Sequence, residues 1–252
     1  MGMSRPQSAQ APPARLDGRS LLLLLAIFGV VFALWNTPVV WPLKILVVFF
    51  HEFSHALATW ITGGSVVAIE LSAAEGGFCV HQGGWDPLVA SAGYLGSMGL
   101  GAMVLVTASR TRRDRWVVAG LGGALIIITL IWVPLTNPFG FFFGLLTGAG
   151  MLLLARFLPD AVSDGWLKVI GLTSLLYAPL DIWSDLIARD IPQSDANVLG
   201  RMIGVPGPVV GAIWGLLALA GAVFALYLSV RRNGAPHEDA AGGPPAARPA
   251  SG

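Results

Sequence analysis

The stretch Val47-Val48-Phe49-Phe50-His51-Glu52-Phe53-Ser54-His55-Ala56-Leu57-Ala58 contains an HExxH motif inside a long apolar run. On a helix, two histidines four residues apart lie on one face, one turn apart, so both imidazoles can reach a single ion. Glu52 follows the first histidine directly and can hold a water molecule at that ion. Zinc lowers the pKa of such a water to about 7, and a glutamate can then take its proton. The motif therefore predicts His51 and His55 as zinc ligands and Glu52 as the catalytic general base.

The apolar surroundings of the motif strengthen this prediction. Ionisable side chains inside a membrane helix are energetically costly and are usually retained for function. The alternative is a pair of polar histidines that pack helices together with a glutamate partner, because intramembrane polar residues also hold helices together.

The composition predicts a multi-pass protein of the cell membrane, in contact with the lipid bilayer. Of the 252 residues, 55% are hydrophobic and 12% are charged, whereas an ordinary globular domain is about 25% charged. The net charge of +1 gives no reason to expect nucleic acid as a partner. Cys79 is the single cysteine, so no internal disulfide can form.

Apolar runs separated by breaks predict about seven transmembrane helices in a single membrane-embedded domain over residues 20–231. The expected spans cover residues 21–35, 41–61, 88–107, 116–133, 139–158, 166–188 and 209–230. The first of these is short for a bilayer that needs roughly 20 residues. The flanks, residues 1–19 with a basic character and residues 232–252, are expected to be disordered tails.

Residues 65–82 differ in kind from the spans. Ser65–Leu71 is rich in β-branched residues, Gly77–Gln82 is a second strand candidate, and Glu75-Gly76-Gly77 between them is turn-like. This pattern predicts a β-hairpin, with an irregular loop as the alternative. The expected fold is an all-α polytopic membrane protein with one small β-hairpin after the HExxH helix. The next span, residues 88–107, is dense in small residues and is expected to pack closely against its neighbours.

An HExxH motif in a membrane helix, followed by a glycine pair and a hairpin, resembles the site-2 protease family of intramembrane zinc metallopeptidases. Within that family the chain is most similar to the compact bacterial branch that has no PDZ domain. The matching residues are His51–His55, Gly76–Val80 and Ala92–Gly96. The resemblance implies a zinc ion held by the two histidines, a glutamate base, an aspartate from a later helix as third ligand, and a membrane-protein substrate cut within or beside its transmembrane segment.

The chain departs from the family at its usual later motif, in which an asparagine and prolines lead to Asp-Gly. Asn137-Pro138 resembles the start of that motif but has no aspartate after it, and Asp181 is followed by Ile182. Among the carboxylates outside HExxH, only Asp181 and Asp185 lie inside an expected span. Both remain candidates for the third ligand, and His81 in the hairpin is a further, weaker one because HExxH sites seldom take a ligand from so mobile an element.

Depth in the membrane favours Asp181 over Asp185. At about 1.5 Å per residue, His55 lies roughly 21 Å below the start of its span, and Asp181 and Asp185 lie roughly 22 and 28 Å below the start of theirs. The preferred ligand set is therefore His51, His55 and Asp181, with Asp185 as the alternative. Another interpretation of the aspartate pair is that it caps the end of the helix.

A helical substrate shields its peptide bonds, so it must unwind before attack. We expect an edge of the hairpin, with Val80 as the candidate residue, to pair with the unwound segment by β-augmentation. The alternative is a hairpin that only seals the bundle. Asn137 is a candidate donor to the substrate backbone, although Asn-Pro is also an ordinary break between helices.

The predicted function is a zinc-dependent intramembrane endopeptidase. The competing hypothesis is a non-catalytic membrane scaffold or chaperone that retains the protease fold. A transporter fits less well, because charged residues on the other spans are scarce.

The basic segments of the sequence give conflicting indications of the membrane orientation. The basic N-terminal flank indicates a cytoplasmic N-terminus, which with seven spans places Arg110–Arg115 outside, whereas that loop and Arg231-Arg232 indicate the reverse. The family resemblance implies a hairpin on the cytoplasmic side. A different number of spans would remove the conflict.

Overall fold

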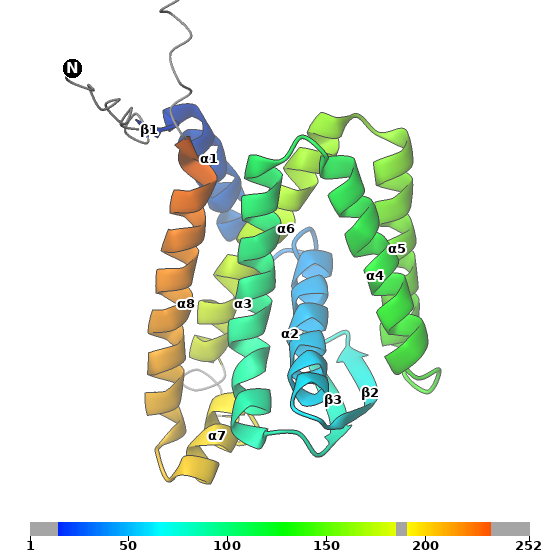
Figure 1. The fold of residues 1–252 in the computed structure, drawn as a ribbon, viewed down its shortest axis with the longest axis vertical. Coiled ribbons are helices and arrows are strands. Elements are labelled where there is room, and N and C mark those ends of the chain that lie inside the picture. The colour runs from blue at the N-terminus through cyan, green and yellow to red at the C-terminus, as the bar shows by residue number, and fades with distance from the viewer. Residues whose placement is uncertain (1–14, 185–190, 233–252) are drawn as a thin grey trace, which may run out of the picture.

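The computed structural model describes residues 15–184 and 191–232, and these form eight helices and two small antiparallel sheets. The helices are α1 Gly18–Ala33, α2 Trp41–Ile61, α3 Asp86–Arg110, α4 Asp114–Trp132, α5 Pro138–Phe157, α6 Asp160–Trp183, α7 Asp195–Ile203 and α8 Gly207–Val230. The strands are β1 Arg15–Leu16, β2 Ser65–Ser72, β3 Gly76–Gln82 and β4 Arg231–Arg232. The long helices α3, α4, α5 and α8 run along the long axis of the molecule, with α2 between α3 and α4 (Figure 1). The predicted helical class and the predicted hairpin are confirmed.

Proline sets the start of several helices. It stands in the first turn of α2, α3, α5 and α8, where its missing N–H would have no intrahelical partner. Helix α2 has the bounds expected from the sequence and is followed by Gly63, whose φ of 82° stops the helix. Proline therefore marks the start of these four helices and glycine the end of α2, whereas α6 begins six residues before the expected span over residues 166–188.

The seven expected spans are not confirmed. Four helices, α3, α4, α5 and α8, are long and apolar enough to cross a membrane, and α1 is a shorter apolar helix. Val31 at the end of α1 and Val40 just before α2 both pack against Leu176, which lies about 24 Å along α6 from its start. Helix α2 thus begins deep in the bundle, where α1 ends, so α1 and α2 follow one another along the bundle where two separate spans were expected.

The two ends of the described chain meet. Strand β1 pairs with β4, with Arg15 opposite Arg232 and Leu16 opposite Arg231, and the Asp17 N–H donates to the Val230 carbonyl at 2.9 Å. A chain whose ends lie on the same side crosses a membrane an even number of times. Residues 15–19, expected as part of a tail, belong to β1 and the start of α1; residues 1–14, 233–252 and Asp185 lie outside the described residues.

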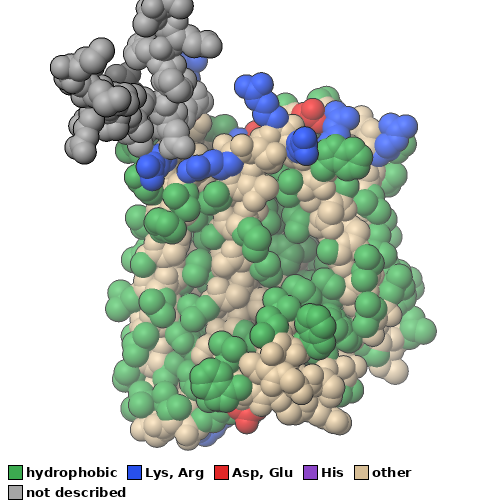
Figure 2. Space-filling model, in the orientation of Figure 1, with side chains coloured by type: hydrophobic (Ala, Val, Ile, Leu, Met, Phe, Trp, Pro, Cys, Tyr) green, Lys and Arg blue, Asp and Glu red, His purple; other side chains and the backbone are tan. Residues whose placement is uncertain are grey.

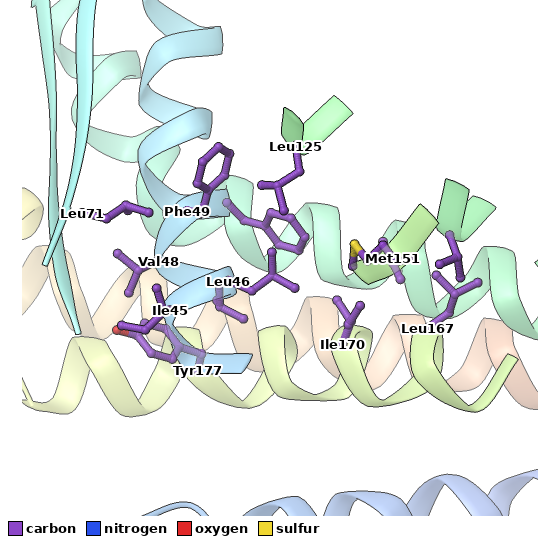
Figure 3. Packing of buried hydrophobic residues seen from close by; sticks show 14 of the residues in the cluster. Ile45, Leu46, Val48, Phe49, Leu71, Leu125, Met151, Leu167, Ile170 and Tyr177 are labelled. Carbon is purple, nitrogen blue, oxygen red and sulfur yellow. The ribbon is translucent and has the colours of Figure 1, made fainter. Parts of the chain in front are cut away.

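Helix α2 is enclosed by the rest of the bundle. Its Ile45, Leu46 and Phe49 are at most 1% exposed and pack against side chains from α4, α5, α6 and β2, as Figure 3 shows. By contrast, α4, α5 and α8 carry exposed leucine, isoleucine and phenylalanine along their outer faces, and in Figure 2 hydrophobic side chains are spread over the flank between the two ends, where the charged side chains gather. The HExxH helix is therefore shielded by helices that are themselves suited to lipid.

The polar connection after α6 differs from expectation. No expected span covers the residues between 188 and 209, and this connection contains the short helix α7. Ser194 caps this short helix, and its Ala196 and Leu199 pack against Tyr94 of α3 and Trp214 of α8. Packing between α3 and α8 holds the start of α7, and with it Asp195, inside the bundle.

Candidate metal centre

The two histidines of HExxH lie on the inner face of α2, His51 at the middle of the helix and His55 one turn further on. His55 is 7% exposed, and its Nδ1 lies 2.7 Å from the carbonyl oxygen of Val89 in α3. Because a carbonyl can only accept, the bond requires the proton on Nδ1, which leaves the lone pair of Nε2 free for a metal. Tyr94 packs edge-on against the ring of His51, with centroids 4.8 Å apart. Helix α3 thus orients both imidazoles.

Asp195 completes a group of three ligand atoms. Its Oδ2 lies 3.0 Å from His51 Nε2 and 3.1 Å from His55 Nε2, and the group lies within 4.8 Å. This oxygen is buried and makes no hydrogen bond of good geometry with any described residue. Three inward-facing ligand atoms that converge on one position are the arrangement expected around a common ion.

Gly93 of α3 keeps that position open. A Cβ atom at residue 93 would overlap all three ligand atoms: His51 Nε2, His55 Nε2 and Asp195 Oδ2. Two imidazole nitrogens and one carboxylate oxygen form a ligand set that catalytic zinc sites use, with the fourth position left for water or substrate. The residues present therefore fit a zinc ion, and the glycine supplies the space for it.

Glu52 lies beside this group at the wall of an open cavity. It is buried, and a Cβ atom on Gly77 would come within 2.7 Å of its Cγ and Oε1, so the glutamate packs directly against β3. The cavity has a volume of about 720 Å³ and is lined by His51, Glu52 and His55 from α2, by β3, and by parts of α3, α6 and α7. A cavity of this size, with the side chains of His51, Glu52 and Asp195 at its wall, can bring water and a peptide segment to the histidine pair.

The side chain of Asn137 fixes which edge of the hairpin is open. Asn137 caps α5 and pairs with the backbone of Leu71 in β2, accepting from its N–H at 3.3 Å and donating to its carbonyl at 2.9 Å. The backbone groups of Leu71 therefore point away from β3. Gly77 is the residue of β3 that pairs with Leu71, and Cys79 lies two residues further along β3. The N–H and C=O groups of Gly77 and Cys79 therefore point away from β2, toward the cavity.

The other residues proposed from the sequence lie as follows. Asp181 lines the same cavity but is not in the group of converging ligand atoms, and Asp185 lies outside the described residues. Val80 is 44% exposed, does not line the cavity, and pairs with Ala68 at a position where backbone groups bond within the hairpin. His81 lines the cavity with its Nδ1 3.2 Å from the Gly83 carbonyl. Asn137 binds β2.

Asp195 was missed because only carboxylates inside expected spans were considered as ligands. Its sequence context did contain a signal. Ser194 followed by Asp195 is typical of a helix start, and Ala196, Leu199 and Ile203 have helical spacing on one face. A short amphipathic helix after the sixth span would have placed a carboxylate at its positive N-terminal end.

Burial and neighbouring groups shift the pKa values of two side chains outside the long helices, Asp195 and Cys79. Burial would raise the pKa of Asp195, but the neighbouring His55 and His51 outweigh it and hold this pKa below the ordinary value. Burial, with a smaller contribution from Glu52, raises the pKa of the Cys79 thiol to about 12. Asp195 is therefore ready to bind a cation as a carboxylate, whereas Cys79 is a neutral thiol at physiological pH.

Comparison with known proteins agrees with this geometry. The model of the family described as Peptidase M50B-like matches residues 24–225, and no PDZ domain is found. No curated protein and no solved structure matches the chain. The match covers the HExxH helix, the hairpin, α7 and most of α8, and it confirms the resemblance to site-2 proteases. The chain belongs to the Peptidase M50B-like family of membrane metallopeptidases.

Proposed function

We propose that this protein is a zinc-dependent endopeptidase of the cell membrane that cuts other membrane proteins within or beside a transmembrane segment. One observation carries the proposal: His51 Nε2, His55 Nε2 and Asp195 Oδ2 converge beside Gly93, with Glu52 in the same cavity. Family membership and the four apolar helices support the setting in a membrane.

The proposed ligands are His51, His55 and Asp195, with Asp195 in place of Asp181. Bound zinc supplies Lewis acidity toward the scissile carbonyl and lowers the pKa of a water molecule to about 7. Glu52 accepts a proton from the attacking water and returns it to the leaving amine. Its contact with Gly77 supports this role, because it brings the glutamate next to the edge of β3.

The substrate segment is proposed to pair with the open edge of β3 through the backbone of Gly77 and Cys79. These groups have no hydrogen bond with described residues across that edge, and they lie along the cavity that contains Glu52. Pairing through the backbone holds an extended segment without demanding a particular sequence. It would also keep the substrate unwound, so that its carbonyl can reach the metal.

Metal analysis and a cleavage assay test the enzyme proposal together. Purified protein should contain one zinc per chain, and Glu52→Ala should keep that zinc and lose cleavage of a membrane substrate. Glu70→Ala is the matched control, because Glu70 is a hairpin carboxylate that does not line the cavity. Protein without zinc would overturn the enzyme proposal, and zinc without Glu52-dependent cleavage would favour the scaffold or chaperone.

The assignment of Asp195 has its own test. Asp195→Ala should strip zinc from the protein and abolish cleavage, because a catalytic zinc site needs its three protein ligands. Full zinc content in Asp195→Ala would contradict the ligand assignment while leaving the histidine pair in place.

Proline substitution tests the β3 edge. The N–H of Cys79 points toward the cavity, so Cys79→Pro removes a donor from the open edge and leaves the bonds to β2 intact. It should keep zinc and impair cleavage, and Cys79→Ala, which retains the N–H, should cleave normally. Normal cleavage by Cys79→Pro would mean that the hairpin only seals the bundle.

A further inference from the structure

The basic side chains of the molecule gather at one end. Arg110 at the end of α3 donates to the Leu228 carbonyl of α8 at 2.7 Å, and Arg115 at the start of α4 pairs with Asp160 of α6 at 2.6 Å. The pairing of β1 with β4 brings the two ends of the described chain, residues 15–16 and 231–232, to the same end of the molecule. Figure 2 shows this basic end as a band of arginine and lysine. It comprises Arg19, Arg110, Arg112, Arg113, Arg115, Arg156 and Arg231.

The opposite end of the molecule has fewer basic side chains. It consists of the hairpin, α7 and the starts of α3 and α8 (Figure 1). Among the described residues, Arg201 is the basic side chain at this end, and its guanidinium donates to the Pro192 carbonyl at 2.7 Å. The connection over residues 184–206 has two arginines and three aspartates in the sequence. The asymmetry therefore lies between two ends of one bundle.

Exposed tryptophans mark both ends as interfacial. Trp116 at the basic end is 72% exposed, and Trp60 and Trp85 at the hairpin end are 68% and 61% exposed. Tryptophan is enriched where a membrane protein meets the lipid headgroups. The two ends thus lie at opposite surfaces of the membrane, with the apolar flank of Figure 2 between them.

We infer that the basic end meets the anionic headgroups of the cytoplasmic leaflet and that the metal centre lies near the opposite surface. Short cytoplasmic loops carry the excess of arginine and lysine in membrane proteins, and the anionic lipids of that leaflet attract such clusters. Arg112 and Arg113, exposed in the short loop between α3 and α4, form no ion pair with any described residue and are free to contact phosphate. The hairpin then lies on the extracytoplasmic side, opposite to what the family resemblance implied.

The same structure removes the conflict in the sequence-based orientation. With α1 and α2 sharing one passage, residues 15–19, the Arg110–Arg115 loop and Arg231-Arg232 lie at one end. All three basic segments then indicate the same orientation.

The inferred orientation has a consequence for the substrate, and this consequence rests on the proposed function. Gly93 marks the metal position and lies about 10 Å along α3 from its start at the hairpin end, but about 26 Å from its end at Arg110. The bond that is cut should therefore lie in the half of the substrate helix farther from the cytoplasm. Water would reach the cavity from the extracytoplasmic side.

Cysteine labelling in intact cells tests the orientation without any need for catalysis. In the full-length chain with Cys79→Ser, a single cysteine is introduced by Gln82→Cys at the hairpin or by Thr111→Cys at the basic end. A membrane-impermeant maleimide should label the Gln82→Cys protein in intact cells and the Thr111→Cys protein only after permeabilisation. Labelling of Thr111→Cys in intact cells, whether alone or equal to that of Gln82→Cys, would overturn the inference.

The inferred orientation and the proposed protease function can be contradicted independently of each other. Both labelling experiments are repeated with Glu52→Ala, which should give the same pattern because orientation does not depend on the base. If zinc and Glu52-dependent cleavage are present but the labelling is reversed, the protease proposal stands and the orientation is wrong. If the labelling holds but no zinc is bound, the orientation stands and the protease proposal falls.

Discussion

Glycine brings helices together in two regions of this molecule, but for different purposes. Between α4 and α5, a Cβ atom on Gly122 would lie 2.7 Å from the Gly148 carbonyl and 2.8 Å from Met151 Cβ. On α3, a Cβ atom on Gly93 would overlap three ligand atoms. The first contact lets two helix backbones approach, as small residues do in membrane bundles, and the second reserves space for an ion. Small residues at helical spacing therefore predict close packing, and only the neighbouring atoms show what is packed.

The largest effect is expected from Gly93→Ala. The added methyl group would occupy the metal position, so zinc should be lost and cleavage should fall by at least about 100-fold, the effect of misplacing a catalytic group by about 1 Å. The fold should survive, because the methyl group meets the tips of three polar side chains and not the backbone of a neighbouring helix. Zinc content, cleavage and thermal unfolding are measured on the same preparation.

Gly99→Ala is the matched control on the same helix, since a Cβ atom there meets nothing within 4 Å. It should keep both zinc and cleavage. If Gly93→Ala also keeps its zinc, Gly93 is a packing residue like Gly122 and the distinction between the two regions disappears.

Gly122→Val should show the opposite pattern. The larger side chain forces α4 away from α5, and overpacking of this kind costs about 1–3 kcal/mol of stability. Cleavage per folded, zinc-loaded molecule should stay near the wild-type level, because neither α4 nor α5 contributes a ligand. Thermal unfolding in detergent measures the stability, and Gly123→Val, with open space at its Cβ, is the control. Loss of zinc in folded Gly122→Val protein would show that the two regions are coupled.

The difference between the regions also explains what the sequence could predict. The bounds of α2, the hairpin and the histidine pair depend on local signals: a four-residue spacing, a glycine stop and β-branched residues around a turn. Asp195 has a local signal only for the start of α7; its place beside the histidines depends on α7 packing against α3, about a hundred residues earlier in the chain. The seven expected spans are not confirmed, because an apolar run shows its length but not the depth at which it begins, and α2 begins deep in the bundle.

Asn137 joins α5, one of the two helices in the α4–α5 contact, to the hairpin beside the metal centre, because it caps α5 and binds β2. Asn137→Ala should cost about 1 kcal/mol for the cap and should loosen the hairpin, so cleavage should fall moderately while zinc is retained. Asn137→Ser separates the two roles: serine restores a cap but is too short to bind Leu71. We expect Asn137→Ser to recover the thermal stability but not the cleavage. Recovery of both would mean that the bonds to β2 do not matter for catalysis.

The smallest effect is expected from Asp181→Ala. Asp181 lines the cavity but is not in the converging group, so zinc content should be unchanged and cleavage should change by only a few-fold. The reason for the difference from Asp195 is geometric: Asp195 stands at the N-terminus of α7, facing the histidines, whereas Asp181 is in the last turn of α6. Zinc titration of Asp181→Ala and Asp195→Ala under the same conditions makes the comparison direct. If Asp181→Ala loses zinc and Asp195→Ala keeps it, the metal is held from α6, and the contacts of Asp195 with the two histidines serve only to orient them.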